Sequence, residues 1–323
     1  MHTGYALFAL SPFYYFVTTS AHFILKDTFI GQDFMHGFNW ETFDDPTHGR
    51  VNFVNQSVAV QANLSFASAT SFIMRADDLN VVPPSARGRN SVRITSHNSY
   101  ADSMIVVDVK HIPEGCGTWP AFWTLSKAGP WPQGGEIDII EGANSQPQNM
   151  ASLHTTSGCS VAQNRSQTGL AVSTACDASV NNNQGCGTSF SKPGSYGSQF
   201  NIMGGGWYVM QRTAQDGISV YFWSRNDARV PAVVKYGAPL IVLDPTWGAP
   251  EAYFPKDSCD YSTHFDAHQI IFDLTFCGDW AGNTFASSNC GKGTCEDFVN
   301  TNPKAFVNAY WEIDSLRVYT PLL

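Results

Sequence analysis

The sequence predicts an all-β protein. From Val51 onward, short runs of alternating apolar and polar residues are separated by clusters of Gly, Pro, Asn and Asp, which is typical of a sandwich or barrel. No stretch has the periodicity of a convincing amphipathic helix. The number of short strands fits two antiparallel sheets packed as a β-jelly-roll sandwich, which leaves few sheet edges uncovered.

The clearest strands combine β-branched and aromatic residues with alternating hydrophobicity. We predict strands at residues 103–111, 136–141, 151–155, 207–213, 218–224, 269–275 and 311–319. Segment 173–206 is rich in Asn and Gly, so we predict a long loop that carries two cysteines.

The first 21 residues resemble a signal peptide. They form an apolar run that ends in small residues, with Thr19 and Ala21 at the −3 and −1 positions of a cleavage site. The run contains Pro12 and is short for a membrane-spanning helix, and the C-terminal residues lack the hydrophobic tail of a GPI signal. Because no internal repeat or linker follows, we predict a single domain at residues 22–323, secreted and without a membrane anchor.

Composition favours a neutral sugar as the ligand. The net charge of −9 argues against nucleic acid, which requires a basic face, whereas the 13% aromatic content suits rings that stack on pyranoses. Eight cysteines without zinc-type spacing predict disulfides in an oxidising compartment, and proximity in the sequence suggests pairing Cys290 with Cys295 and Cys176 with Cys186. We expect a monomer that needs no cofactor or metal.

The stretch GGEIDIIEG at 134–142 reads as a catalytic strand. Side chains alternate along a strand, so Glu136 and Asp138 share one face, whereas Glu141 should point the other way. One extra residue, accommodated as a β-bulge near Ile139 or Ile140, would bring all three acids onto the same face. We predict that bulge.

Three neighbouring acids raise the pKa of at least one member, which suits glycoside hydrolysis. A retaining enzyme needs an ionised nucleophile and a protonated acid, with their carboxyl groups roughly 5–5.5 Å apart. The alternative is a solvated acidic strand without a catalytic role. The spacing of the acids alone does not decide between the two, because acids make up 27 of the 323 residues.

The flanking motifs favour the catalytic interpretation. They are GTWPAFW at 117–123, WPQGGEIDIIEG at 131–142, DPTHGRVN at 45–52, GRNSVRI at 88–94, FCGDWAG at 276–282 and AYW at 309–311. With them the sequence resembles glycoside hydrolase family 16, and within it the fungal secreted endo-β-1,3-glucanases (laminarinases). The resemblance implies a jelly roll with a concave substrate cleft across one sheet, and a single catalytic domain at 22–323.

The resemblance also implies catalytic roles. Glu136 matches the nucleophile, Glu141 the acid/base and Asp138 the acid that tunes the pair. His154 matches a histidine in the next strand that contacts substrate or Asp138; a lone strand histidine is otherwise structural. Arg93 matches an arginine that reaches the cleft, and its alternative is a surface salt bridge.

Further candidates for sugar contact are aromatic. Trp123 shares a strand face with Trp119, and we favour Trp123 as a stacking residue while leaving Trp119 open between core and cleft. Trp131 enters the catalytic strand and suits a cleft wall, and Trp280 suits the cleft rim. Asn144, three residues after Glu141, is a candidate for a sugar hydroxyl contact.

The sequence therefore predicts a secreted retaining endo-β-1,3(4)-glucanase. Its partner would be a β-glucan polysaccharide, either laminarin-like or from a fungal wall. Two alternatives stay open: a transglycosylase of the same fold, and a non-catalytic glucan-binding wall protein. The three carboxylates Glu136, Asp138 and Glu141 argue against the non-catalytic alternative.

Overall fold

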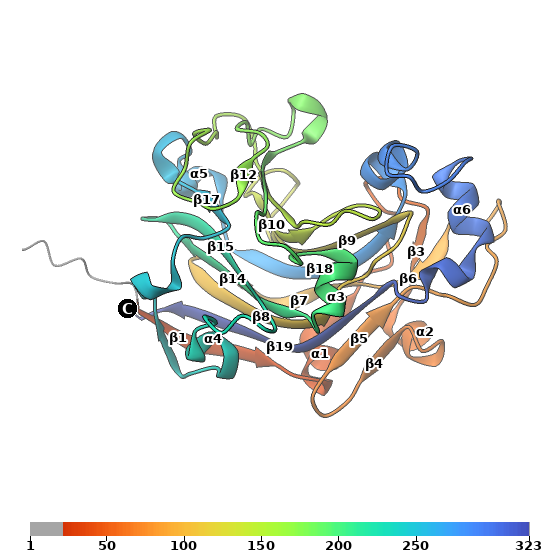
Figure 1. The fold of residues 1–323 in the computed structure, drawn as a ribbon, viewed down its shortest axis with the longest axis horizontal. Helices are drawn as coiled ribbons and strands as arrows, with labels where there is room; N and C mark the ends of the chain where they lie inside the picture. Colours follow the sequence, from red (N-terminus) through yellow and green to blue (C-terminus); the bar gives the residue numbers. More distant parts are fainter. Residues whose placement is uncertain (1–21, 323) are drawn as a thin grey trace, which may run out of the picture.

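Two antiparallel sheets pack face to face in the computed structural model, which describes residues 22–322. The predicted signal peptide at 1–21 lies outside the described residues. In Figure 1 the sheet that contains β9, β10 and β18 lies above the sheet that contains β1, β8, β14 and β19. The predicted all-β sandwich is confirmed.

The first sheet has nine strands, and all of its pairings are antiparallel. Its main path runs through β16 (Leu240–Val242), β1 (His22–Phe29), β19 (Tyr310–Pro321), β8 (Ser103–His111), β14 (Gly206–Thr213), β15 (Gly217–Ser224) and β17 (Ala252–Phe254). Off this path, β19 also pairs with β5 (Phe72–Arg75), which pairs with β4 (Ser65–Ala67).

The second sheet has eight strands and carries the predicted catalytic strand near its middle. Its order is β12 (Leu170–Ala171), β13 (Cys186–Ser189), β11 (Met150–His154), β10 (Glu136–Glu141), β9 (Thr118–Ser126), β18 (His268–Phe276), β7 (Arg93–Tyr100) and β2 (Phe38–Trp40). The strands predicted at 103–111 and 136–141 have the observed bounds of β8 and β10.

Short elements complete the described part of the chain. Among the described strands, the only parallel pair joins β3 (Val51–Phe53) to β6 (Arg89–Ser91). The helices and helical turns are α1 (Gln32–Gly37), α2 (Gln56–Gln61), η1 (Asn181–Asn183), α3 (Gly197–Ile202), α4 (Ala232–Tyr236), η2 (Pro245–Trp247), η3 (Lys256–Ser258), α5 (Tyr261–His264), η4 (Gly278–Gly282), α6 (Cys295–Thr301) and η5 (Pro303–Phe306). Among the described helices, none has the length and apolar character that crossing a membrane requires.

The prediction of one long loop at 173–206 is wrong in part. This segment contains β13, which pairs with β11 next to the catalytic strand, and the short helix α3. Both are short, and β13 has the sequence Cys-Gly-Thr-Ser, so neither produces a clear periodic signal. Pairing across the sheet fixes β13 despite its weak intrinsic preference for a strand.

The main hydrophobic core lies between the two sheets. Ile137 and Ile140 of β10 are fully buried in it, together with Val107 of β8 and Tyr208 of β14. Phe122 stacks on Phe272 with ring centroids 4.3 Å apart, which ties β9 to β18 within the core. The catalytic strand is therefore anchored by its apolar face, and its carboxylates occupy the opposite face.

All eight cysteines form disulfides: Cys116–Cys290, Cys159–Cys259, Cys176–Cys186 and Cys277–Cys295. The predicted Cys176–Cys186 pair is confirmed. The predicted Cys290–Cys295 pair is wrong, because each of these residues bonds a cysteine more distant in the sequence. Folding brings Cys116 beside Cys290 across 174 residues, a contact that sequence proximity does not predict.

Candidate active site

A β-bulge shapes the strand that carries the three carboxylates. On the β9 side, Asp138 pairs with Trp123, whereas Ile140 pairs with the adjacent residue Phe122, so β10 contains one extra residue here. On the β11 side the register also shifts, between Asp138 and Glu141. The predicted bulge is confirmed, and it restores the parity that a regular strand would break.

Asn149 satisfies the backbone groups that the bulge leaves without ladder partners. Its side-chain oxygen accepts a hydrogen bond from the Glu141 backbone N–H (3.0 Å), and its amide nitrogen donates to the Ile139 carbonyl (2.8 Å). Asn149 is fully buried, so no water replaces these bonds. No local sequence pattern points to Asn149, because its role depends on how β10 pairs with β11.

Each glutamate accepts a hydrogen bond from an indole N–H. Trp119 Nε1 donates to Glu141 Oε1 (2.8 Å), and Trp131 Nε1 donates to Glu136 Oε2 (2.7 Å). The two tryptophans come from different places: Trp119 lies in β9, and Trp131 lies in the turn that precedes β10. Both rings therefore lie beside the carboxylates, and neither is confined to the core.

Asp138 is 2% exposed and lies between the glutamates in the sequence. His154 Nε2, on β11, lies 3.3 Å from Asp138 Oδ2, as the β10–β11 pairing allows. Burial opposes the charged form of His154, but the hydrogen bond and charge of Asp138 outweigh burial and raise the His154 pKa to about 10. His154 thus carries a positive charge next to Asp138 at neutral pH.

The surroundings of the two glutamates favour their protonated forms. Burial raises the pKa of both above the usual carboxylate range, and the charge of Asp138 raises it further. The charge of Glu136 also raises the pKa of Glu141, so the two glutamates lose their protons in separate steps. Over part of the pH range the pair therefore holds one anionic and one protonated carboxyl on one face.

The turn entering β10 is fixed by backbone geometry and a buried histidine. Gly135 has φ +81°, and a Cβ there would overlap the ring of Phe265, so this position requires glycine. Burial lowers the pKa of His268 to about 3, and the neutral ring donates from Nε2 to the Gly134 carbonyl (2.6 Å). These contacts orient the turn that carries Trp131.

Arg93 is buried next to the carboxylate face. Its guanidinium carbon lies 4.9 Å from the Trp123 ring centroid, and its Nη1 lies 3.7 Å from Asp273 Oδ2. The Trp123 Nε1 donates to the same Asp273 oxygen (3.0 Å). Arg93 is 7% exposed, so the alternative of a surface salt bridge is wrong. Asp273, which orients both Arg93 and Trp123, was not among the residues that sequence analysis identified.

Trp280 lies in the helical turn η4 and packs edge-on against Trp119, with ring centroids 5.7 Å apart. It also lines a cavity of about 320 Å³ together with Ala143 and hydroxyl side chains of Ser and Thr. Because Trp119 bonds Glu141, this cavity lies near the acid end of β10. Trp280 therefore lies near Glu141 by way of Trp119, and its contact with sugar stays a prediction.

Asn144 has a structural position. It is 1% exposed, and its amide nitrogen donates to the Ala281 carbonyl (3.0 Å) and to Thr284 Oγ1 (3.0 Å). Its oxygen accepts from the Gly117 N–H (2.8 Å). Both amide hydrogens of Asn144 thus bond groups within the protein, which corrects the prediction of a sugar contact. Asn144 instead joins three loops at the end of β10.

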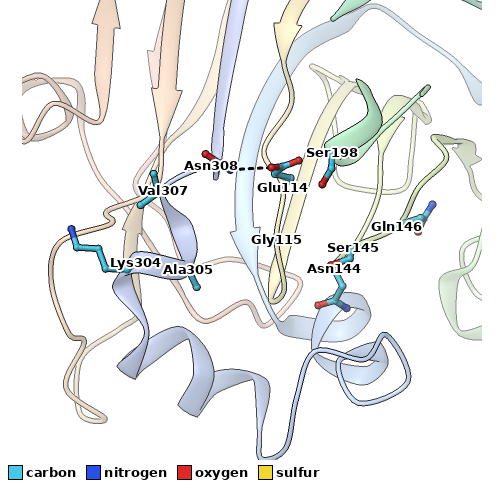
Figure 2. A pocket seen from close by; sticks show the side chains of 11 residues that line it. Glu114, Gly115, Asn144, Ser145, Gln146, Ser198, Lys304, Ala305, Val307 and Asn308 are labelled. Atoms are coloured by element: carbon cyan, nitrogen blue, oxygen red, sulfur yellow. Dashed lines mark hydrogen bonds between the residues drawn. The ribbon is translucent and has the colours of Figure 1, made fainter. Parts of the chain in front are cut away.

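A second cavity, of about 170 Å³, lies beyond this loop and is polar (Figure 2). On one side Asn308 Nδ2 donates to Glu114 Oε1 (3.1 Å), and Lys304, Ser145 and Gln146 lie around it. None of the three carboxylates of β10 lines either of these two cavities. The polar cavity is therefore separate from the chemistry of the glutamates.

Glu136, Asp138 and His154 each place one oxygen or nitrogen atom within 4.8 Å of the others. A metal would require these atoms to be free of protons. The pKa of His154 is raised to about 10, so its ring holds a proton at neutral pH and has no free lone pair for a metal. The arrangement fits a network that shares protons better than a metal centre.

The arrangement of acids and tryptophans agrees with comparisons across the whole chain. The profile of the XgeA-like catalytic GH16 domain matches residues 38–319. The chain belongs to glycoside hydrolase family 16. The match includes the whole second sheet and every residue of the site described above, and among the described residues it leaves out 22–37 and 320–322.

Similar family 16 proteins include enzymes that break and enzymes that join glucan chains. Laminarinase 16A from Phanerochaete chrysosporium, solved with 6-O-glucosyl-laminaritriose in donor and acceptor sites, has a TM-score of 0.90 at 46% identity; the match covers 93% of this chain and all of that one. An elongating family 16 β-1,3-glucosyltransferase has a TM-score of 0.84 at 38% identity; the match covers 92% of this chain and all of that one.

A probable endo-1,3(4)-β-glucanase of Aspergillus fumigatus is 40% identical over 307 residues, which cover 91% of this chain. The same match covers only 45% of that relative. The chain thus spans less than half the length of this curated relative, and the similarity concerns the family 16 domain.

Proposed function

We propose that this protein is a secreted retaining endo-β-1,3(4)-glucanase that hydrolyses internal β-1,3 linkages of laminarin-like or fungal wall glucan. The observation that carries the proposal is the bulged strand β10, which presents Glu136, Asp138 and Glu141 together on one face. A double displacement needs two neighbouring carboxyls, one ionised and one protonated.

In this mechanism Glu136 is the nucleophile. Its carboxylate attacks the anomeric carbon and forms a covalent glycosyl-enzyme, while Glu141 protonates the leaving oxygen. Glu141 then accepts a proton from water, which releases the sugar with retained configuration. The negative charge of Asp138 raises the Glu141 pKa and so helps Glu141 hold its proton before attack.

Sugar contacts are proposed for residues on the same face. Trp123 and Trp131 offer ring surface for stacking on pyranoses, and Trp280 extends this surface beyond Glu141. The Arg93 guanidinium makes no hydrogen bond within 3.5 Å to any described residue, so it has donors left for sugar hydroxyls. His154 is proposed to act through Asp138.

We propose secretion because four disulfides are stable only in an oxidising compartment. The second candidate activity is transglycosylation, in which a sugar hydroxyl replaces water as the acceptor. It is favoured by the similarity to the β-1,3-glucosyltransferase. Hydrolysis and transfer share the glycosyl-enzyme and differ only in how an acceptor is bound.

The test is product analysis by mass spectrometry and NMR after incubating wild type and Glu136→Gln with laminarin, lichenan and cellulose. Shorter β-1,3 oligosaccharides with retained configuration, formed by wild type alone, would support hydrolysis with Glu136 as nucleophile. Chains longer than the substrate would instead indicate transglycosylation. Binding without any change in any glucan would refute both activities and leave a glucan-binding protein.

Two variants test the assigned roles. Azide should rescue Glu136→Ala and give an α-glycosyl azide, because azide enters the space left by the nucleophile. Glu141→Gln should keep most activity on substrates with good leaving groups, which need no proton. Equal loss on all substrates would exclude Glu141 as the acid.

A further inference from the structure

The two catalytic glutamates are each held by one indole N–H at one carboxyl oxygen. Trp131 Nε1 lies 2.7 Å from Glu136 Oε2, and Trp119 Nε1 lies 2.8 Å from Glu141 Oε1. An indole nitrogen only donates, so the bonded oxygen must be the acceptor in each pair. One oxygen of each carboxyl is thereby occupied, and the other is left free.

We propose that Trp131 and Trp119 are positioning residues that determine which oxygen of each glutamate reacts: Glu136 Oε1 attacks, and Glu141 Oε2 carries the proton. This inference rests on the proposed double displacement. It assigns to both tryptophans a role that a stacking surface does not require, because a ring stacks equally well without its N–H.

The assignment gives each step a defined path. In the first step Glu136 Oε1 forms a bond to the anomeric carbon as the glycosidic C–O bond breaks, and the departing oxygen takes the proton from Glu141 Oε2. In the second step water gives a proton back to Glu141 Oε2 while its oxygen bonds the anomeric carbon, and the bond to Glu136 Oε1 breaks. Both indole N–H groups keep their acceptors throughout.

The sequence positions of the tryptophans suit these separate tasks. Trp119 belongs to β9, and its backbone pairs with Thr275 of the neighbouring strand β18. Its indole is therefore attached to a paired strand within the sheet. Trp131 is 44% exposed and lies in the turn held by His268 through the Gly134 carbonyl. Glu141 therefore accepts its indole hydrogen bond from a strand of the sheet, whereas Glu136 accepts its indole hydrogen bond from the turn that precedes β10.

Both bonds stabilise the ionised carboxylate, so loss of either should raise the pKa of the glutamate it holds. Other charged groups also act on the pair: Asp138 from the same strand, His154 from β11 and Arg93 from β7. None of these changes when an indole N–H is removed. The shift should therefore appear in the glutamate that loses its donor.

The test replaces Trp119 or Trp131 by β-(3-benzothienyl)alanine, in which sulfur takes the place of the N–H and the ring shape is kept. The acidic limb of kcat/KM reports the nucleophile and the basic limb reports the acid. Replacing Trp131 should move the acidic limb up by about one pH unit, and replacing Trp119 should move the basic limb up by a similar amount. Replacing Trp207, whose N–H bonds the Asp108 carboxylate on the other sheet, is the matched control and should move neither limb.

Unmoved limbs in active Trp119 and Trp131 variants would overturn the positioning role. A change in KM alone would do the same, since it indicates stacking. Titration of glutamate labelled with ¹³C at Cδ measures the two carboxyl pKa values without substrate. If wild type acts on no glucan but these pKa values rise in the variants, the proposed function fails and the hydrogen-bond assignment stands.

Discussion

Asn149→Ala is the variant that most directly tests how the catalytic strand is built. It removes the only side chain in the described chain that bonds both the Ile139 carbonyl and the Glu141 N–H. Asn149 is fully buried, so both backbone groups would lose their partners without access to water. The bulge would then have to relax, and Glu141 would move with it.

The expected loss of stability follows from these two backbone groups, the Ile139 carbonyl and the Glu141 N–H. Leaving one buried polar group without a partner costs about 1–3 kcal/mol, so Asn149→Ala should lower the free energy of unfolding by about 2–6 kcal/mol. Displacing a catalytic group by about 1 Å costs on the order of a hundredfold in rate. We therefore expect kcat on laminarin to fall roughly a hundredfold in protein that is still folded.

Urea unfolding and laminarin kinetics measure the two effects. Asn144→Ala is the control, because Asn144 is also buried and also bonds three backbone or side-chain groups, but none of them belongs to the bulge. It should lose comparable stability and retain most of its kcat. If Asn149→Ala does not fold, Asn149→Asp keeps the acceptor for the Glu141 N–H, while its second oxygen replaces the donor to the Ile139 carbonyl and adds a buried carboxyl. Full kcat in folded Asn149 variants would refute the argument that this side chain places the acid.

Two further predictions concern charge and crosslinks. Asp138→Asn removes the charge that raises the pKa of both catalytic glutamates. Both limbs of the kcat/KM profile should therefore move to lower pH by about one unit. Unmoved limbs would show that Asp138 does not tune the pKa values of the two glutamates. Replacing both cysteines of the Cys116–Cys290 pair by Ser should lower the free energy of unfolding, measured in urea, by about 5 kcal/mol. The same change in the Cys176–Cys186 pair should lower it by about 3 kcal/mol. The difference arises because a crosslink that closes a longer loop removes more entropy from the unfolded chain. Equal losses would contradict this entropic account.

Features encoded by local pattern could be predicted from the sequence. The bounds predicted for β8 and β10 are those observed, because alternating hydrophobicity and β-branched residues determine both. The bulge could be predicted as well, since Glu141 has the wrong parity in a regular strand. The Cys176–Cys186 pair is close in the sequence and needed no knowledge of the fold.

Features that depend on distant contacts could not be predicted. Asp273 is on β18, and only the pairing of β18 with β7 and β9 brings it to Arg93 and Trp123. Asn144 lies in the predicted place along the chain, but the loop folds its side chain inward to Ala281. In each case the sequence identifies a residue type with suitable chemistry, and the packing decides which atoms it meets.

The bulge resolves a conflict between the two faces of β10. Three acids on one face repel one another and must desolvate, which costs stability. A regular strand would relieve the conflict by turning Glu141 toward the core, but it would also turn one core isoleucine outward. With the bulge, Ile137, Ile139 and Ile140 are all fully buried, while the carboxylates stay together on the other face. The apolar contacts of these three isoleucines thus offset the repulsion that the catalytic arrangement requires. The extra residue that permits both is Ile139, whose backbone carbonyl accepts a hydrogen bond from Asn149.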